Sequence, residues 1–591
     1  MRRSADPPIR RSAGYLLPLM GEVARGALIP VVRRSRSARL TVRRRRLLTR
    51  AAPLGGAAAL AFSAGVVSAT GPGRAEHRLV TRYVSAWAHG DYASMYRLLD
   101  AGSRRRISER DLVAAYRGAA STATLDAVVP GRVGNRTGNF IPVRMRVRTS
   151  LFGTLPEVLQ VPLSGSGSDA SIHFSGALLF PGLRPGERLR RRVSMLPRGA
   201  LLASDGTPLA QGSARASPIP DVASQVVGKL GAIAPAQAAA YAAEGFPRAA
   251  KVGADGLERT FQQRLAGKPG GTLLAGKRVL ARASPSAGLP VTTTIDPTIE
   301  RAAIKAMGQQ YSGIVAMDPR TGALLALAGI AYSAPQPPGS TMKIITSTGA
   351  LQAGIATLGE TFPIMTGATI DGYTLQNASG EACGGTLLNA FAVSCNSVFA
   401  PLGAKLGARR LVNVAKRFGF DEPPSIPGAA ESVIPSASTI GDALSVGSSA
   451  IGQGKVLSTP LEMTDAAATI AMGGRRPIPT LLARQPPRFY PVTSARIAGL
   501  VQKMMVAVVQ FGTGTPAQIP GVQVAGKTGT AELRSTTASS SPQNTDSWFV
   551  GYAPVGVPRV VVGALFPAQG AGAATAAPAV REVLVAALHA H

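Results

Sequence analysis

Apolar residues change their spacing several times along this 591-residue chain, and each change predicts a different kind of element. From residue 74 onward they recur every three or four positions, which predicts helices; the positions are Leu79, Val80, Tyr83, Val84 and Trp87, continued by Met95, Leu98 and Leu99. Residues 108–111 (Ser-Glu-Arg-Asp) have the form of a capping box, which predicts another helix start.

A strand signal follows these helices. Alternation of apolar and polar residues predicts a strand with one buried face, and the apolar positions are Ile141, Val143, Met145 and Val147. Helices followed by strands predict a small α+β domain over residues 74–182. No cluster of catalytic residues occurs in it, so we expect it to act as a spacer.

A second unit is expected over residues 183–290, and it is predicted to be rich in β-structure. Residues 198–206 are typical of a short strand that ends in the turn Asp205-Gly206.

The last unit is expected over residues 291–591. Two apolar runs, 314–318 and 323–327, are separated by Asp-Pro and Thr-Gly and predict a hairpin. A helix-rich middle follows, and the end of the chain returns to predicted strands at residues 522–525, 548–552 and 560–565. We therefore expect a sheet built from both ends of this unit, with a strand order that the pattern leaves open.

The beginning of the chain has a different character. Residues 1–50 are rich in arginine and are predicted to be a largely disordered cytoplasmic tail. Residues 51–73 carry no charge, and a run of about 20 residues suffices to span a bilayer. With the basic flank inside, we expect a single-pass signal anchor in the cell membrane and an extracytoplasmic catalytic part. A signal peptide cleaved near Val67-Ser68-Ala69 and an ordinary apolar helix remain alternatives.

The formal net charge of +33 comes mostly from arginine. A basic chain is typical of nucleic-acid binding. Here, many arginines precede residue 51 and the others are scattered, without a stripe of interleaved aromatic residues. We therefore predict that nucleic acid is not a partner.

Histidine is almost absent, and this limits the catalytic bases and metal ligands that the chain can supply. The chain has five histidines, with none between Thr292 and Leu588. A Ser-His-Asp triad and a zinc site with histidine ligands are excluded from that region. We expect no metal and no cofactor, and a nucleophilic serine there would need another base, for which lysine is the obvious candidate.

Three short polar motifs in the last unit carry the candidate chemistry. They are Ser340-x-x-Lys343, Ser394-Cys395-Asn396 and Lys527-Thr528-Gly529-Thr530. Residues three apart share a helix face, so Lys343 is predicted to lie beside Ser340. Lysine accepts a proton only when neutral, so burial or a nearby cation must lower its pKa.

These motifs, in this order, are the set of penicillin-binding proteins and serine β-lactamases. With further stretches, the chain resembles a class B (monofunctional) penicillin-binding protein, a peptidoglycan D,D-transpeptidase; the stretches are 198–206, 256–259, 265–267, 451–454, 459–461, 512–514 and 548–554. The resemblance implies an α/β (α+β) transpeptidase domain of the penicillin-binding and serine β-lactamase type over 291–591. It implies a β-rich pedestal, or dimerisation, domain over 183–290 before it. Residues 74–182 are similar in length and order to a nuclear-transport-factor-like (MecA-N-type) domain.

The resemblance also implies roles for single residues. Ser340 would be acylated and Lys343 would be its base, while Ser394 would relay a proton to the leaving amine. Asn396 would bind the substrate amide and steady Lys343. Lys527 and Thr528 would hold the terminal carboxylate of a D-alanyl-D-alanine stem peptide, and Gly529 would let the substrate backbone approach. The oxyanion hole would be formed by the backbone N–H groups of Ser340 and Thr530.

The implied partners are peptidoglycan stem peptides, β-lactam antibiotics, the membrane, a glycosyltransferase polymerase and proteins of division or elongation. Whether Cys383 and Cys395 form a disulfide is left open, because sequence does not fix their geometry.

Three rival functions remain. One is a β-lactamase, in which Glu422 or Glu431 would position water, although neither lies in a Glu-x-x-Leu-Asn context. A β-lactam sensor would keep the serine chemistry without turnover. A P-loop nucleotide-binding protein would use residues 521–528, which fit Gly-x4-Gly-Lys-Thr but alternate like a strand.

Overall fold

The computed structural model describes residues 73–533 and 544–590. The predicted tail and all but the last residue of the predicted anchor 51–73 lie outside the described residues. Within the described part, no helix is both long and apolar enough to cross a bilayer.

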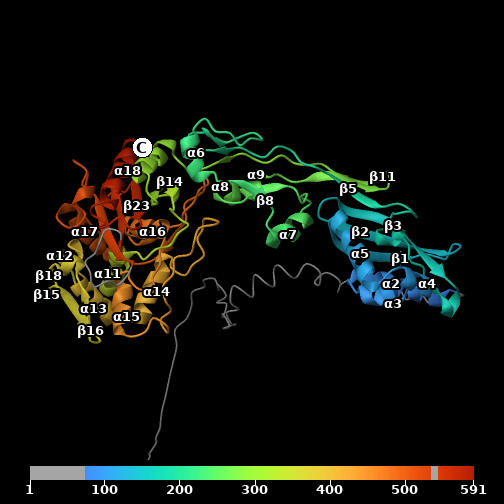
Figure 1. The fold of residues 1–591 in the computed structure, drawn as a ribbon, viewed down its shortest axis with the longest axis horizontal. Coiled ribbons are helices and arrows are strands. Elements are labelled where there is room, and N and C mark those ends of the chain that lie inside the picture. The colour runs from blue at the N-terminus through green and yellow to red at the C-terminus, as the bar shows by residue number, and fades with distance from the viewer. Residues whose placement is uncertain (1–72, 534–543, 591) are drawn as a thin grey trace, which may run out of the picture. The chain divides into compact units, whose positions relative to one another are not determined.

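The described chain begins with a small α+β unit (Figure 1). Four helices precede a four-stranded sheet of order β1-β2-β3-β4, and all its paired strands are antiparallel. The elements are α2 (Arg74–Ala88), α3 (Tyr92–Arg97), α4 (Ala101–Arg106), α5 (Glu109–Ala123), β1 (Leu125–Val133), β2 (Phe140–Thr149), β3 (Gly153–Ser164), η1 (Gly167–Asp169), β4 (Ser171–Ile172) and η2 (Gly176–Leu179).

Local sequence signals explain these elements. Ser108 caps α5 by accepting a hydrogen bond from the Asp111 N–H at 3.1 Å, so the helix start predicted from residues 108–111 is confirmed. Strand β2 buries every second residue, which confirms the alternation seen from Ile141 to Val147. The predicted helical run is interrupted, because α3 ends at Arg97 and Leu99 instead makes an isolated bridge with Ile172.

The next part is rich in short strands. The elements are β5 (Leu189–Ser194), β6 (Leu201–Leu202), β7 (Pro208–Ala210), α6 (Pro220–Val226), β8 (Leu230–Ala232), η3 (Pro235–Gln237), α7 (Ala238–Ala243), β9 (Lys251–Gly253), α8 (Gly256–Thr260), α9 (Gln262–Leu265), β10 (Gly270–Ala275), β11 (Arg278–Ala283) and β12 (Val291–Thr292). The strand and turn predicted over 198–206 are present as β6 and the Asp205-Gly206 turn. Strand β12 pairs in parallel with β6, so the chain entering the last unit is tied to this part.

The last unit contains the largest sheet. Its elements are α10 (Pro297–Met307), β13 (Gly313–Asp318), β14 (Ala323–Gly329), η4 (Gly339–Met342), α11 (Lys343–Gln352), β15 (Thr361–Met365), β16 (Gly367–Ile370), β17 (Tyr373–Gln376), η5 (Ala378–Gly380), β18 (Cys383–Thr386), α12 (Leu387–Ala392), α13 (Asn396–Leu406), α14 (Ala408–Phe418), α15 (Ala443–Ala450), α16 (Pro460–Ala471), β19 (Arg475–Pro477), β20 (Phe489–Pro491), α17 (Ala495–Gln510), η6 (Thr515–Ala517), β21 (Ala525–Glu532), β22 (Thr545–Ala553), β23 (Val560–Phe566) and α18 (Ala576–Ala590).

The five strands are ordered β14-β13-β23-β22-β21, and every neighbouring pair is antiparallel. The hairpin β13–β14 and the two late strands β22 and β23 confirm the prediction of a sheet assembled from both ends of the unit. The strand predicted at 522–525 begins only at Ala525. Val522 donates its N–H to Ile519 in a local turn, so it is not available to a sheet partner.

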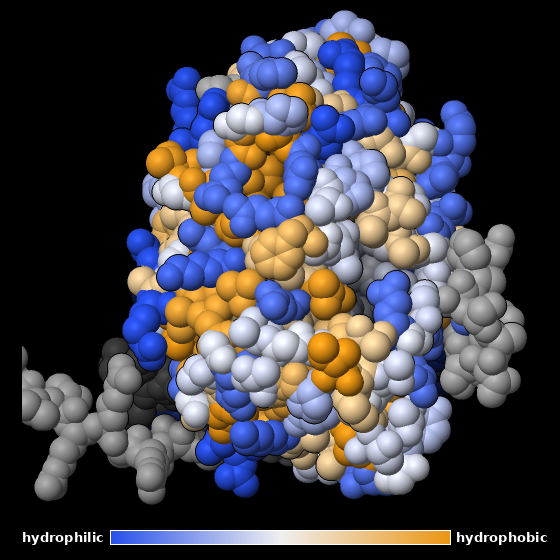
Figure 2. All heavy atoms as spheres, turned by 90° about the vertical axis from the view of Figure 1, so that its left-hand side faces the viewer, coloured by the Kyte–Doolittle hydropathy of each residue, from blue (hydrophilic) through white to orange (hydrophobic). Residues whose placement is uncertain are grey.

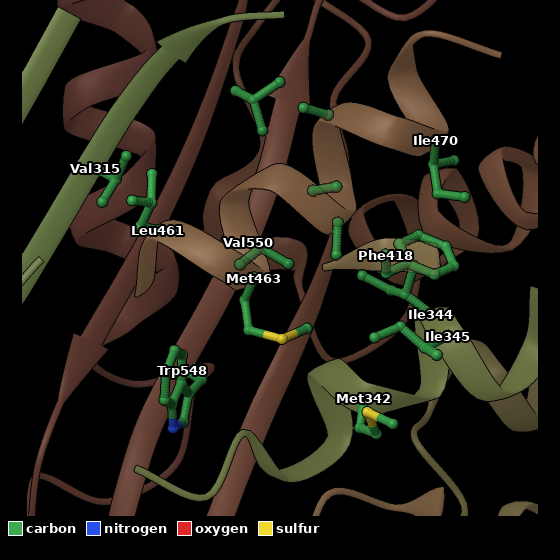
Figure 3. Close-up of a cluster of buried hydrophobic side chains, with 14 of the residues drawn as sticks. Val315, Met342, Ile344, Ile345, Phe418, Leu461, Met463, Ile470, Trp548 and Val550 are labelled. Atoms are coloured by element: carbon green, nitrogen blue, oxygen red, sulfur yellow. The ribbon is translucent and has the colours of Figure 1, made fainter. Parts of the chain in front are cut away.

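This sheet is buried on both faces. Ile314 and Ala316 belong to the cluster that includes residues of α10 and α18, whereas Val315 and Met317 belong to the cluster on the other face. Figure 3 shows how the second cluster joins the helices after η4 to the strands: Met342, Ile344 and Ile345 lie in it together with Trp548 and Val550. The segment that carries Ser340 is therefore anchored directly on the central sheet.

Candidate active site

Ser340 lies in a single 3-10 turn that runs straight into a buried helix. The turn is η4, and α11 begins at Lys343 and is buried from that residue through Leu351. Other elements of the fold surround this helix. Ser340 itself stays partly exposed at the entrance, while the Lys343 side chain is fully buried.

The amine of Lys343 is held by the second motif. Its Nζ donates to the Ser394 carbonyl oxygen at 2.7 Å and to Asn396 Oδ1 at 2.8 Å, and it lies 3.3 Å from Ser394 Oγ. Asn396 is oriented in turn because its Nδ2 donates to the Gln376 carbonyl at 2.9 Å. A neutral amine has two hydrogens, so these two acceptors use both and leave its lone pair free to take a proton.

Ser394 connects the first motif with the third. Its Oγ lies 2.9 Å from Lys527 Nζ, so one hydroxyl bridges two lysines that are far apart in sequence. Its backbone has φ of 65°, in the left-handed region that costs a non-glycine residue about 1–3 kcal/mol. The turn is held by the hydrogen bond from Cys395 N to Ala390 O at 2.8 Å.

The surroundings of Lys343 and Lys527 lower the pKa of both amines. Burial, together with the nearby charge of Lys527, lowers the pKa of Lys343 well below its ordinary value. Burial lowers the pKa of Lys527 to about 7. No acidic side chain forms an ion pair with either amine among the described residues. A positive charge on Lys527 therefore favours the neutral form of Lys343.

The third motif lies inside strand β21, at the edge of the five-stranded sheet. Lys527 pairs with Val550 and Thr528 with Phe549 in the β21–β22 ladder. A P-loop would need a turn that opens into a helix at this point. The strand geometry therefore rules out the P-loop interpretation of residues 521–528.

Gly529 has a structural role as well as the predicted one. A Cβ at this position would lie 2.8 Å from both the Pro338 carbonyl oxygen and the Trp548 Cβ. Strand β21 can therefore approach the nucleophile turn only where the side chain is missing. This packing brings Thr530 next to Gly339. A Cβ added at Gly339 would lie 2.7 Å from the backbone carbonyl oxygen of Thr530.

Two residues outside the three motifs, Gly452 and Thr513, also support the site, and the sequence analysis gave neither a role. Gly452 accepts a hydrogen bond from Gly339 N at 3.0 Å and has φ of 76°, so it braces the turn that presents Ser340. Thr513 is hydrogen-bonded through its hydroxyl to that of Thr528 at 2.5 Å. Both lie in glycine-containing stretches, 451–454 and 512–514, which were part of the resemblance and could have pointed to them.

Cys383 and Cys395 are joined by a disulfide. The bridge links the start of β18 to the residue between Ser394 and Asn396. It therefore fixes the loop that orients Lys343 to the neighbouring small sheet.

Replacing both cysteines with serine is expected to lower the free energy of unfolding of the last unit by about 3 kcal/mol, because closing a loop of this length restricts the unfolded chain. Urea unfolding followed by tryptophan fluorescence measures this change. Reduced wild type should match the double variant. Equal stability of oxidised wild type and variant would contradict a stabilising bridge.

Comparison with known proteins agrees with this geometry. The family described as penicillin binding protein transpeptidase domain matches residues 312–585, and the penicillin-binding protein dimerisation domain matches residues 203–278. Peptidoglycan D,D-transpeptidase PbpA of Mycolicibacterium smegmatis is 33% identical over 414 residues, which cover 59% of this chain and 80% of that protein.

Solved structures give the same result. The D,D-transpeptidase domain of a peptidoglycan glycosyltransferase from Eggerthella lenta is 28% identical with a TM-score of 0.54, covering 67% of this chain and 99% of that one. The imipenem acyl-enzyme of penicillin-binding protein A from M. tuberculosis is 28% identical with a TM-score of 0.53, covering 66% and 98%. The fold and site define a serine acyl-transfer enzyme. The chain belongs to the penicillin-binding protein transpeptidases.

Proposed function

We propose that this protein is a peptidoglycan D,D-transpeptidase that cross-links stem peptides through an acyl intermediate on Ser340. The observation that carries the proposal is the convergence of two buried lysines on one hydroxyl. Lys343 and Lys527 both lie within hydrogen-bond distance of Ser394 Oγ, and Ser340 opens the helix turn that ends at Lys343.

Acylation begins when Ser340 Oγ attacks the carbonyl carbon of the penultimate D-alanine. The serine proton passes to the lone pair of neutral Lys343, and a tetrahedral oxyanion forms. The backbone N–H groups of Ser340 and Thr530 receive this oxyanion, and each such donor is worth about 3 kcal/mol. When the C–N bond breaks, the departing amine of the last D-alanine takes a proton relayed by Ser394.

The terminal carboxylate of the donor is bound at the edge of β21. Protonated Lys527 supplies a charge-assisted hydrogen bond, and Thr528, oriented by Thr513, supplies a hydroxyl. Asn396 faces the donor amide. An amine of a neighbouring stem peptide then attacks the acyl-serine, regenerates Ser340 Oγ–H and leaves a new amide bond. A β-lactam enters the same path as a donor mimic and leaves a covalent acyl-enzyme.

The rival serine functions find less support. Glu422, one candidate to position a deacylating water, instead forms an ion pair with Arg476 at 2.7 Å. Glu431 is exposed to solvent. Neither carboxylate makes a hydrogen bond to Lys343 or Ser394 among the described residues.

The remaining parts fit a wall-synthesis enzyme held at a membrane. In this proposal residues 1–50 are the cytoplasmic tail and 51–73 a signal anchor, with the rest extracytoplasmic. Residues 74–182 form a spacer of the nuclear-transport-factor-like type, supported by its helices-then-sheet order. Residues 183–290 form the pedestal and 291–591 the transpeptidase domain. A glycosyltransferase polymerase and division or elongation proteins are the proposed partners.

The test uses purified protein, a stem pentapeptide donor ending in D-Ala-D-Ala and an excess of an amine acceptor. We expect release of D-alanine and a donor–acceptor amide, both detected by mass spectrometry and both blocked by prior treatment with penicillin. Penicillin labelling without an amide product would indicate a sensor. Release of hydrolysed penicillin at many turnovers would indicate a β-lactamase.

A further inference from the structure

Two phenylalanines flank the second motif, one on each side. Phe391 lies in α12, three residues before Ser394, and Phe399 lies in α13, three residues after Asn396. Their rings make a T-shaped contact with centroids 5.8 Å apart and planes inclined by 67°. Such a contact fixes the orientation of both rings. The loop that binds the two lysines is therefore held between helices that are joined by an aromatic pair.

Each ring of this pair faces a different lysine. Lys527 Nζ lies over the Phe391 ring, and Lys343 Nζ lies over the Phe399 ring, each 5.5 Å from the ring centroid. An ammonium group within about 6 Å of a ring centroid is attracted by the negative face of the ring. A neutral amine carries no charge to be attracted in this way. Each ring therefore favours the protonated form of one amine.

The contacts between rings and amines are shielded from water. Phe391, Phe399, Lys343 and Lys527 are all 0% exposed, and the attraction between a cation and a ring is stronger when both are desolvated. Figure 2 shows the side of the molecule that carries α12, β15 and β18 in Figure 1, and there strongly apolar residues form small separate patches among polar ones. The aromatic pair is thus an internal part of the site and not an exposed docking surface.

No acidic side chain takes the place of the rings. A buried charge is costly unless a partner compensates it. The charged group that faces Lys343 is Lys527, which repels it, and neither amine forms an ion pair among the described residues. The hydrogen-bond acceptors described above and the two ring faces are what stabilises an ammonium at either position.

The other ionisable residues on neighbouring elements are exposed or have partners of their own. On α13, Lys405 donates to the Ile355 carbonyl; on α14, Arg409, Arg410 and Lys416 are exposed and Arg417 donates to the Val492 carbonyl; on α16, Glu462 and Asp465 lie beside Arg476; on α17, Arg496 and Lys503 are exposed; and on β22, Asp546 accepts from Ala568 N while Tyr552 donates to Gln502.

We propose that Phe391 and Phe399 are positioning residues that stabilise the charged forms of the two lysines at different stages of the reaction. Phe391 stabilises the Lys527 ammonium that binds the carboxylate of the donor. Phe399 stabilises the ammonium that forms on Lys343 when the proton of Ser340 moves to Lys343 Nζ and the Oγ–C bond forms. The rings take no part in a covalent step. The inference rests on the proposed function and adds two aromatic residues to the same site.

The two rings should control opposite ends of the pH profile. Weakening the attraction of a ring for its ammonium lowers the pKa of that amine, because only the charged form loses stabilisation. At Lys527 a lower pKa moves the alkaline decline of acylation to lower pH. At Lys343 a lower pKa moves the acid decline to lower pH, and it also slows acylation at the plateau because the base binds the serine proton less strongly.

The test places 3,4,5-trifluorophenylalanine at position 391 or at position 399 of the full chain. The fluorine atoms withdraw electrons from the ring face, which weakens its attraction for a cation and largely preserves the shape of the ring. Stopped-flow acylation by a chromogenic cephalosporin is measured across pH. At position 391 we expect the alkaline limb to move down by about 0.5–1 pH unit with the acid limb unchanged. At position 399 we expect the acid limb to move down by a similar amount, with a slower plateau.

Two sets of variants control this experiment. Phe391→Leu and Phe399→Leu remove each ring and should move the same limbs in the same directions. Trifluorophenylalanine at position 418 alters a fully buried ring of α14, over which no amine lies among the described residues, and should move neither limb. Slower acylation with both limbs in place at positions 391 and 399 would assign the rings to packing alone and overturn the proposal. Failure of every β-lactam to acylate the wild type would refute the proposed function instead.

Discussion

Replacing Ser340 with alanine is expected to abolish covalent attachment of penicillin and all transpeptidase turnover. The reaction needs an oxygen that forms and later breaks an ester, and in the proposed mechanism this oxygen is the Ser340 hydroxyl in the turn that leads into α11. Fluorescent penicillin on denaturing gels and intact-protein mass spectrometry measure the loss. Thermal stability should change little, because Ser340 is partly exposed and no hydrogen bond holds its side chain among the described residues.

Ser347→Ala is the matched control for this experiment. Ser347 lies farther along α11, and its buried hydroxyl has no hydrogen-bond partner among the described residues. Its removal should leave labelling intact. Equal labelling of wild type and Ser340→Ala, or an adduct found on another residue, would remove Ser340 as the nucleophile.

Lys343→Met should slow acylation by about 10²–10⁴-fold, the usual contribution of a general base. Methionine keeps an unbranched side chain that is one atom shorter, and its weakly accepting thioether sulfur does not take up the serine proton. The Ser394 carbonyl and Asn396 Oδ1 also lose a donor, so a moderate loss of stability accompanies the change. Stopped-flow acylation by a chromogenic cephalosporin measures the rate, and Lys405→Met, an exposed lysine near the end of α13, is the control.

The pH profile distinguishes a lost base from a distorted site. Burial lowers the pKa of Lys343 well below its ordinary value, so wild-type acylation should remain active well below pH 10 and fall only as acid protonates this amine. Lys527 must be protonated to hold a carboxylate, and its pKa of about 7 predicts a decline in second-order acylation above neutral pH. A bound carboxylate stabilises the cation and raises that pKa, so the alkaline decline should weaken at saturating ligand.

In Lys343→Met the acid limb should disappear while the alkaline limb stays. A variant that merely misplaces Ser340 would keep both limbs at a lower rate. Retention of wild-type acylation in Lys343→Met would assign the base to another group.

Much of the local structure followed from the sequence. The period-two pattern of Ile141 to Val147 defined β2, and Ser108 defined the start of α5, because both depend on neighbours close in the chain. The motif residues Ser340, Lys343 and Asn396 were identified by type and order, and the structure places the Lys343 amine in hydrogen-bond contact with Asn396. The absence of histidine between Thr292 and Leu588 had already excluded an imidazole base from that region.

Local pattern could not decide between a P-loop and a strand for the segment that contains Lys527. Its glycines, lysine and threonine suit both, and the choice is made by pairing with β22, which lies beyond the residues the pattern spans. The same limit explains Val522, which alternates like a strand residue but closes a local turn.

The sequence by itself determined which side chains are available for catalysis and which elements carry them. Only the tertiary structure decided that Lys343 and Lys527 share the hydroxyl of Ser394, and that the disulfide ties this loop to β18. Burial lowers the pKa of both amines, the charge of Lys527 lowers that of Lys343 further, and both effects arise from packing around α11 and β21. Neither effect is a property of residues close together in the chain, so no reading of local pattern could supply it.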